Sequence, residues 1–371
     1  MTKTLLVGGG LTSAVTAYLL TKPGQLRNLE LCVWDKARGC GGRMSTSRLT
    51  SNSNATCSAD LGAQYITATE DYAKIHSDYY NDLLANKLLD PLKLPIEGHK
   101  TPVDGSMNYV CPQGSSSLVK HFFKEAAAQV KFGKKVSKIE NNSKQWTVMA
   151  EDGETESFDA IILTMPVPQI LELLSNSSQL EYGENDSGQK SILSQLKEVK
   201  YSSRYAIALL YECESESDIE IVKNNIRLEN GACAKYITGD SVFRYVSFDN
   251  YKRANNPNCI SSVMVPLSVV FHTSIPFGIE NIEKTPDEVQ PILLDRIEKL
   301  FPSWPKPTVV KCQKWRYSQV QQSYPGNPGC VEILSSPLLL AGGDGFMHSN
   351  FDGCIQSAEA IVKTFMDKTN K

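Results

Sequence analysis

Three consecutive glycines near the start of the chain limit its possible folds more than any other feature. The short apolar run Leu5–Val7 ends at Gly8, Gly9 and Gly10, and a helical pattern of alanines and leucines follows directly. A strand, a glycine turn and a helix in this order form the first half of a dinucleotide-binding βαβ unit. In such a unit Gly8 permits the tight turn and Gly10 lets the backbone approach a pyrophosphate. The helix N-terminus, which includes Thr12, then faces the phosphates.

The rest of this nucleotide fingerprint is present with one departure. Ser13 occupies the third glycine position, and because serine is small the pattern is weakened but not lost. The next predicted strand, 29–35, ends in Asp35, at about the separation that places a carboxylate on the ribose hydroxyls. The glycines alone would also fit a turn in an ordinary α/β domain. Together with the strand, the helix and the acid, they predict nucleotide binding.

Two short motifs after Asp35 indicate that the nucleotide is FAD. A Gly-Gly-Arg sequence ending at Arg43 resembles an element of the amine-oxidase and hydroxylase flavoenzymes. In those enzymes its glycines pass under the dinucleotide and its arginine meets the phosphates. The Asp-Leu-Gly-Ala-Gln segment that ends at Gln64 resembles the turn beside the flavin ring in the same superfamily. Aligned N–H groups there would favour negative charge on a reduced flavin, whereas the segment taken alone predicts only a turn.

A second strand and helix at the other end of the chain complete the FAD prediction. The apolar run 338–344 ends in Gly343 and Asp344, and a final helix begins near Asn350 with Gly353 close behind. This combination resembles the second signature of FAD enzymes, and the resemblance implies that Asp344 binds the ribityl or phosphate linker. The helix N-terminus would face the flavin edge where negative charge collects on reduction. Two half-sites at opposite ends of one chain are far more specific than either alone.

Composition narrows the class of protein. The chain has 371 residues, 41% of them hydrophobic, which suffices for a full core and two domains. A net charge of −3 with mixed signs gives no indication of nucleic acid or a membrane surface as a partner. The N-terminal glycine loop would be lost with a cleaved leader, so we interpret the N-terminus as structure. Ten scattered cysteines without a CxxC pattern predict no metal site and a reduced, cytoplasmic protein.

Hydrophobic periodicity predicts an α/β chain. Helical spacing occurs at 71–90 and 287–300, and the apolar segment 158–166 predicts a parallel-type strand that is stopped by Pro166 and Pro168. Several β-rich runs between 201 and 277 predict an antiparallel sheet, and the polar segment 175–190 predicts a surface loop. We therefore predict two interleaved domains. The predicted FAD-binding domain comprises residues 1–75, 107–166 and 330–371, and the predicted substrate domain comprises residues 76–106 and 167–329.

Sequence blocks spread over almost the whole chain resemble the renalase family of flavoproteins. The blocks include ADLGAQYIT at 59–67, LTMPVP at 163–168, YSSRYA at 201–206, KCQKWR at 311–316, and GGDGF with SNFDGC between 342 and 354. The central and C-terminal blocks are specific to this family. The resemblance implies a two-domain, Rossmann-type fold like that of p-hydroxybenzoate hydroxylase. It also implies non-covalent FAD and a substrate domain built on a mixed or antiparallel sheet.

The resemblance also implies an activity. Family members oxidise 2- and 6-dihydroNAD(P), isomers that inhibit dehydrogenases, to β-NAD(P)⁺ while O₂ is reduced to H₂O₂. Hydride transfer to a flavin needs stacking and orientation more than an acid–base pair. We expect Trp315 to hold the flat nicotinamide ring, with His272 and Arg244 as polar groups toward its carboxamide or phosphates. The structural alternatives are core packing for Trp315 and His272 and a solvated strand face for Arg244.

Three other functions are compatible with the sequence. The family resemblance also includes catecholamine oxidation, and a monoamine oxidase would need an aromatic cage, for which Tyr201, Tyr205 and Tyr211 are candidates. A protein secreted without a cleaved signal could use FAD only as a structural element in signalling, although two intact flavin signatures argue against this. An ordinary NAD(P)H oxidase would differ only in the ring carbon that gives up the hydride.

Overall fold

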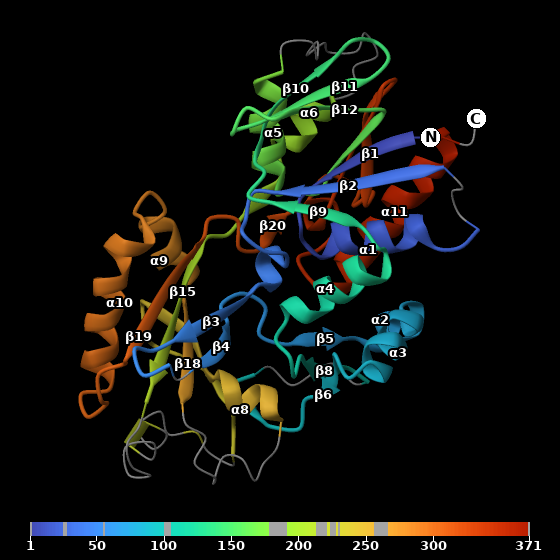
Figure 1. The fold of residues 1–371 in the computed structure, drawn as a ribbon. Coiled ribbons are helices and arrows are strands. Elements are labelled where there is room, and N and C mark those ends of the chain that lie inside the picture. The colour runs from blue at the N-terminus through green and yellow to red at the C-terminus, as the bar shows by residue number, and fades with distance from the viewer. Residues whose placement is uncertain are drawn as a thin grey trace. The chain divides into compact units, whose positions relative to one another are not determined.

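The computed structural model describes residues 2–24, 28–54, 56–99, 105–177, 191–212, 221–222, 228, 231–255 and 266–369. The chain forms two compact units, each built from separate stretches of sequence (Figure 1). The first unit comprises residues 1–42, 118–201 and 319–371, and the second comprises residues 43–117 and 202–318. Packing thus groups residues 43–75 and 107–117 with the second unit, whereas their motifs had assigned them to the FAD-binding part.

A six-stranded sheet in the order β21-β22-β13-β1-β2-β9 forms the centre of the first unit (Figure 1). All neighbouring strands are parallel except the β21–β22 pair at one edge. The strands are β1 (Thr2–Val7), β2 (Leu29–Asp35), β9 (Gln129–Phe132), β13 (Ala160–Leu163), β21 (Cys330–Ser335) and β22 (Leu338–Gly342). The residues of β13 are all apolar and buried, as expected for a strand covered on both faces. Because β1 and β22 both run parallel to β13, their glycine-bearing carboxyl ends lie on the same side of the sheet, where the strands end.

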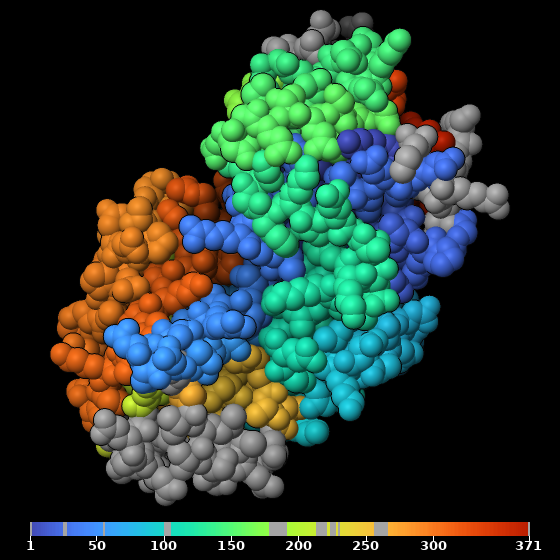
Figure 2. Space-filling model, in the orientation of Figure 1, coloured from blue at the N-terminus to red at the C-terminus, as the bar shows by residue number. Residues whose placement is uncertain are grey.

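The helices that follow the two glycine motifs pack against each other. These are α1 (Leu11–Thr21) and α11 (Phe351–Thr369). Eight of the eleven residues of α1 are buried, including Ser13, so small side chains suit this helix. The unit also contains α4 (Ser116–Glu125, whose first two residues belong to the second unit), β10 (Val136–Asn141), β11 (Trp146–Ala150), β12 (Thr155–Phe158), α5 (Val167–Ser175), α6 (Ile192–Leu196), β14 (Lys200–Tyr201), β20 (Val320–Gln322) and the 3₁₀ turn η3 (Asp344–Phe346). Figure 2 shows β10, β11 and α5 together in green at one end of this unit.

The second unit contains a six-stranded sheet in the order β19-β15-β18-β17-β16-β7. Its strands pair antiparallel, except for the parallel β16–β7 pair, so the sheet is mixed as predicted. The strands are β7 (Ile96–Glu97), β15 (Arg204–Tyr211), β16 (Ala234–Tyr236), β17 (Phe243–Phe248), β18 (Leu267–Thr273) and β19 (Val309–Trp315).

Two different layers cover this sheet. Helices α9 (Ile275–Glu280) and α10 (Pro286–Leu300) pack on strands β15 and β19. The hairpin β3 (Thr46–Thr50) and β4 (Thr56–Asp60) packs on β19 and β18, beside α8 (Asp249–Ala254). Alternate residues of β15 enter two separate apolar clusters: one contains Leu293 and Ile297 of α10, and the other contains Leu49 and Ala59 of the hairpin.

The remaining elements of the second unit lie between the hairpin and residue 117. They are the 3₁₀ turn η1 (Gly42–Met44, which begins at the last residue of the first unit), β5 (Ile66–Ala68), α2 (Glu70–Ile75), α3 (Ser77–Ala85), β6 (Asp90–Pro91) and β8 (Met107–Val110). The helix predicted at 71–90 is therefore wrong as a single element, because the backbone of His76 leaves the helical conformation between α2 and α3. The helix predicted at 287–300 is confirmed, and Thr285 and Glu288 form a capping box at its start.

Two predictions concern the surface and the membrane. Residues 178–190 of the predicted surface loop lie outside the described residues. Among the residues that the structure describes, no helix is long and apolar enough to cross a membrane.

Candidate functional site

Packing inside the first unit explains two of the three N-terminal glycines. Gly8 has φ of +117°, and a Cβ atom there would lie 2.7 Å from Oγ1 of Thr164. A Cβ atom on Gly9 would lie 3.0 Å from Oδ2 of Asp35, the oxygen that accepts a hydrogen bond from the Gly9 amide. Asp35, the predicted ribose ligand, therefore lies directly beside the glycine turn and holds its backbone.

Protein atoms do not restrict Gly10 in this way. Its surroundings therefore test whether a dinucleotide phosphate fits beside the glycine turn. A Cβ atom built on Gly10 would meet no atom within 4 Å. Gly10 begins α1 without a side-chain cap, and the first turn of α1 contains no acidic residue. The amides at the positive end of this helix therefore adjoin space that the protein does not fill, as a bound phosphate requires. Thr12 lies buried in the same first turn.

The second glycine motif meets the first through Thr164, which directly follows β13. Gly343 has φ of +120°, and a Cβ atom there would lie 3.2 Å from the Thr164 carbonyl oxygen. The Gly343 amide donates to Oγ of the buried Ser357 at 2.7 Å, and this hydroxyl donates to the Gly329 carbonyl at 2.6 Å. Sequence analysis missed Thr164 and Ser357. The only signal for Thr164 was its position at the end of a predicted strand.

The start of α11 is equally constrained. Asn350 accepts a hydrogen bond from the Gly353 amide at 2.6 Å, and a Cβ atom on Gly353 would lie 2.4 Å from the His348 carbonyl oxygen. Asp344 is buried and accepts a hydrogen bond from Ser349. The first unit thus contains eight of the predicted cofactor ligands, each at the end of a sheet strand or at the start of the following helix. They are Gly8, Gly10, Thr12, Asp35, Gly343, Asp344, Asn350 and Gly353.

Arg43 and Gln64, the other two predicted cofactor ligands, belong to the second unit. The backbone of Arg43 lies against the turn 60–64. A Cβ atom on Gly62 would lie 1.9 Å from the Arg43 carbonyl oxygen, and the same oxygen accepts a hydrogen bond from the Ala63 amide at 2.9 Å. On the same turn, the Leu61 carbonyl accepts a hydrogen bond from Nε1 of Trp315 at 2.7 Å. The turn is therefore fixed by its own neighbours.

The predicted substrate residues lie on one face of the second sheet. Strand pairing places Trp315 opposite Arg204, His272 opposite Ala206, and Tyr245 opposite His272. Residues that pair across strands share a face, so these side chains line the face that the β3–β4 hairpin also covers. Sequence analysis missed Arg204 and Tyr245, because only the register brings them beside His272.

His272 is half-buried and contacts Gln64. Its Nε2 atom lies 3.2 Å from Nε2 of Gln64, while Oε1 of Gln64 accepts hydrogen bonds from Lys252 at 2.8 Å and Ser247 at 3.0 Å. Burial, followed by the charges of Arg204 and Lys252, lowers the pKa of His272 to about 3. His272 is therefore a neutral ring at physiological pH.

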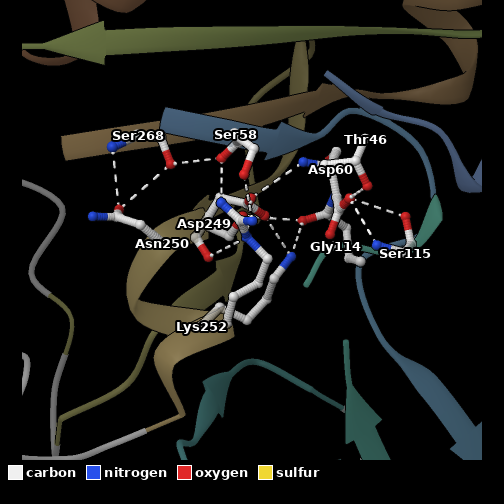
Figure 3. A network of polar contacts seen from close by, with 12 residues as sticks. Thr46, Ser58, Asp60, Gly114, Ser115, Asp249, Asn250, Lys252 and Ser268 are labelled. Carbon is white, nitrogen blue, oxygen red and sulfur yellow. Dashed lines mark hydrogen bonds and ion pairs between the residues drawn. The ribbon is translucent and has the colours of Figure 1, made fainter. Parts of the chain in front are cut away.

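Lys252, which donates to Gln64, also belongs to a buried ionic network that Figure 3 shows. Oδ1 of Asp249 pairs with Lys252 at 2.8 Å and Oδ2 pairs with Arg253 at 2.9 Å, while Asp249 and Lys252 are fully buried. Asp249 also accepts a hydrogen bond from the Asp60 amide at 3.2 Å. Burial alone would raise the pKa of Asp249, but Lys252 and Arg253 outweigh it and lower that pKa. Burial and the charge of Asp249 raise the pKa of Asp60.

The carboxylate of Asp60 has its own hydrogen-bond donors. Thr46 Oγ1 donates at 2.6 Å, and Ser115 donates from its amide at 3.1 Å and its hydroxyl at 3.0 Å. Figure 3 shows Asp249 and Lys252 on one side of Asp60 and Thr46 and Ser115 on the other. Sequence analysis missed the network, because acids and bases three and four residues apart are more common on solvated helices.

Aromatic rings extend the site along the same sheet. The hydroxyls of Tyr65 and Tyr236 lie 2.6 Å apart, and the ring of Tyr236 packs edge-on against Tyr245. Arg244 is exposed, and its guanidinium lies 5.2 Å from the centre of the Tyr236 ring. The hydroxyl of Tyr245 is buried and has no partner among the described residues.

The three tyrosines that sequence analysis considered for an amine cage lie elsewhere. Tyr205 is buried and donates to the carbonyls of Asn281 and Lys284. The Tyr211 ring packs on Trp304. Tyr201 belongs to the first unit, where its hydroxyl accepts a hydrogen bond from the Val167 amide.

Two protein families match the chain. Residues 6–83 match the NAD(P)-binding Rossmann-like domain, and residues 76–362 match the flavin containing amine oxidoreductase family. Mouse renalase is 40% identical over 363 residues, which covers 98% of this chain and 98% of the mouse protein.

Solved structures share the fold at low sequence identity. A protein described as a protoporphyrinogen oxidase from an Exiguobacterium species has a TM-score of 0.67 at 11% identity, with 98% of each chain covered. A putrescine oxidase variant has a TM-score of 0.64 at 10% identity, with 99% of each chain covered. An oxidoreductase from Methanosarcina mazei has a TM-score of 0.55 at 13% identity, with 97% of this chain and all of that one covered. With the family matches, these similarities confirm the predicted α/β fold of Rossmann type with a mixed sheet.

Proposed function

The chain belongs to the renalase family and is an FAD-dependent oxidoreductase, and on this basis we propose its substrate. We propose that the chain oxidises 2- and 6-dihydroNAD(P) to β-NAD(P)⁺. In this proposal O₂ is the second substrate, H₂O₂ is the second product, and FAD is held without a covalent bond. Removing these isomers would relieve their inhibition of dehydrogenases.

The observation that carries the substrate proposal is the positive charge around His272. Arg204 and Lys252 both lower the pKa of His272, and Arg244 lies over Tyr236 on the neighbouring strands. A dinucleotide brings a pyrophosphate and hence negative charge, which arginine binds well. A substrate that arrives as an ammonium ion would be repelled by the same groups. An anionic dinucleotide therefore suits this face of the sheet better than an amine.

The roles of the chain's own residues follow from this charge and from the shape of the ring. FAD, when bound, supplies a two-electron acceptor that O₂ can reoxidise with formation of H₂O₂. In the proposal the indole of Trp315 packs on the flat dihydronicotinamide ring and holds it for hydride transfer. Neutral His272 donates a hydrogen bond to the carboxamide oxygen, and Arg204 and Arg244 meet the phosphates. No residue needs to remove a proton from the substrate before the hydride leaves.

Anaerobic mixing of the FAD-bound protein with possible reductants tests the proposal. We expect 6-dihydroNAD to bleach the flavin absorbance rapidly, while 4-dihydroNADH and a catecholamine do so slowly or not at all. Admission of O₂ should then restore the absorbance, with one H₂O₂ formed for each β-NAD⁺. A flavin that no dihydronicotinamide isomer reduces would overturn the proposal, as would equal reduction by the 4- and 6-isomers.

A truncated substrate separates phosphate recognition from ring recognition. Arg244→Gln should raise KM for 6-dihydroNAD about tenfold, corresponding to one lost charged contact. It should leave the KM for a 6-dihydronicotinamide that carries only an N-methyl group unchanged. Arg316→Gln is the matched control, because Arg316 is partly exposed and pairs with the exposed Glu283. If both arginine variants behaved alike, the assignment of Arg244 to the phosphates would be wrong.

The second candidate function is amine oxidation, and the aromatic rings of the second sheet favour it. Tyr65, Tyr236 and Tyr245 provide adjacent ring faces and edges of the kind that could enclose an uncharged amine. In that case the catecholamine, not 6-dihydroNAD, would bleach the flavin. Tyr236→Phe and Tyr245→Phe would then alter the rate of bleaching by the amine.

A further inference from the structure

The orientation of the Gln64 side-chain amide is determined by its hydrogen-bond partners. One end of the amide lies 2.8 Å from Nζ of Lys252 and 3.0 Å from Oγ of Ser247, and an ammonium group can only donate. That end is therefore the carbonyl oxygen. The opposite end is the NH₂ group, which donates to the Asp60 carbonyl and lies 3.2 Å from Nε2 of His272.

This orientation determines the tautomer of His272. An NH₂ group can only donate, so Nε2 of His272 must accept and cannot carry a proton. In a neutral imidazole the proton then resides on Nδ1. Nδ1–H is the donor that the proposed function assigns to the substrate carboxamide. Gln64 thus determines which ring nitrogen carries the donor.

Lys252 is unusual in being a fully buried lysine with two partners, Oδ1 of Asp249 and Oε1 of Gln64. Rotating the amide by 180° would place its oxygen against the Asp60 and Gly62 carbonyls, which accept hydrogen bonds from the NH₂ group. It would also point NH₂ at the ammonium group of Lys252, which is a strongly unfavourable contact. We propose that Lys252 is a positioning residue that, together with the Asp60 carbonyl at the other end, locks the Gln64 amide and thereby holds the ring proton of His272 on Nδ1.

The other charged and titratable groups near His272 lie on the elements packed around it. Arg204 on β15 and Lys252 on α8 disfavour a cationic ring, and Asp249 on α8 favours one. Tyr245 on β17 packs edge-on against the ring, with centroids 5.8 Å apart. A charge changes the ease of protonating the ring, whereas a hydrogen bond to one ring nitrogen selects between the two neutral tautomers. Among the described contacts, the hydrogen bond to Nε2 comes from the Gln64 amide, at 3.2 Å.

Long-range ¹H–¹⁵N spectra of the imidazole rings in the FAD-bound protein test the proposal directly. The chain contains five histidines, and His272→Gln identifies the signals of His272. In the wild type we expect a pyrrole-like Nδ1 and a pyridine-like Nε2 at neutral pH. In Lys252→Met the constraint at the oxygen end of the amide is lost, so a fraction of the molecules should have the rotated amide and Nε2 should become partly pyrrole-like. An unchanged His272 spectrum in folded Lys252→Met would overturn the proposal.

A second variant covers the case in which Lys252→Met fails to fold. Gln64→Glu keeps the contact with Lys252 but places a carboxylate oxygen against Nε2. His272 should then carry its proton on Nε2, and a pyridine-like Nε2 in this variant would contradict the proposal. Lys299→Met is the matched control, because Lys299 forms an exposed pair with Asp295 far along the chain on α10. Its His272 signals should equal those of the wild type.

The role of Nδ1–H toward the substrate rests on the proposed function. Kinetic measurements separate a failure of that function from a failure of the inference about Lys252. Lys252→Met should lower kcat/KM for 6-dihydroNAD roughly tenfold while FAD stays bound, as expected for one misplaced hydrogen bond. If the wild-type flavin is not reduced by any dihydronicotinamide, the proposed function fails while the spectra still decide the role of Lys252. If the wild type is reduced but the spectra of Lys252→Met and Gln64→Glu match it, the proposed function stands and the role of Lys252 is overturned.

Discussion

The α-carbon of Gly62 lies so close to the carbonyl oxygen of Arg43 that no side chain fits between them: a Cβ atom would lie 1.9 Å from that oxygen. The Ala63 amide donates to the same oxygen at 2.9 Å. Residues 43 and 62, which belong to two separate flavin motifs in the sequence, therefore form one backbone contact inside the second unit. Glycine is required here by a close approach of main chains and not by a special φ angle.

Replacing Gly62 should destabilise the protein. The methyl group of Gly62→Ala would overlap a backbone atom, so the turn 60–64 must move, and overpacking of this kind costs about 1–3 kcal/mol. Urea unfolding of the FAD-free protein should show that loss in the free energy of unfolding. Gly39→Ala is the control, because a Cβ atom on Gly39 meets nothing within 4 Å and the free energy should stay within about 0.5 kcal/mol. Equal stability of the two variants would show that the contact is not restrictive.

Gly10→Ala should have the opposite profile, with a nearly normal stability and a loss of FAD. The added methyl group meets no protein atom within 4 Å, so the FAD-free protein should unfold within about 1 kcal/mol of the wild type. It would occupy the space beside the start of α1 where we predict the pyrophosphate to bind, so FAD affinity should fall at least about tenfold. Titration of the FAD-free protein with FAD measures this. Unchanged affinity would place the pyrophosphate elsewhere.

Local motifs carried most of the fold prediction, because their chemistry is complete within a few residues. The turn at Gly8 needs a positive φ angle. The helices α1 and α11 need suitable N-cap residues, which are Gly10 for α1 and Asn350, which accepts a hydrogen bond from the Gly353 amide, for α11. Such requirements leave a visible pattern in the sequence. The break between α2 and α3 left no such pattern. The helical spacing of apolar residues continues through His76, whereas the backbone leaves the helical conformation there.

Contacts between distant residues could not be predicted in the same way. Asp249 meets the Asp60 amide across 189 positions, and Arg204 pairs with Trp315 only because β15 and β19 have one particular register. The charged residues of α8 follow the spacing of a solvated helix, and nothing local indicates that Lys252 is fully buried. Sequence analysis therefore proposed His272 and Trp315 as site residues but did not predict the residues that hold and surround them.

The two buried acids of the network should respond differently to loss of charge. Asp249→Asn leaves Lys252 and Arg253 without their carboxylate, and breaking a buried pair in this way costs about 3–5 kcal/mol. Asp60→Asn keeps Oδ1 as the acceptor for Thr46 and Ser115 and removes the repulsion that raises the pKa of Asp60. Its free energy of unfolding at pH 7 should change by no more than about 1 kcal/mol. Equal losses in the two variants would contradict the different directions of their pKa shifts.

His272 should make the folded protein less stable in mild acid. Its pKa lies at about 3 in the folded state, below the ordinary value of 6.5, so below pH 6.5 the unfolded chain binds a proton that the folded protein excludes. Stability is therefore lost as the pH falls through this window, by up to about 1.4 kcal/mol per pH unit. Urea unfolding of the wild type and His272→Gln at several pH values isolates this contribution, because other groups titrate in both proteins. The difference between the two should move in favour of His272→Gln as the pH falls from about 6 to about 5. A constant difference would mean that His272 is protonated in the folded state, and Nε2 could then not accept a hydrogen bond from Gln64.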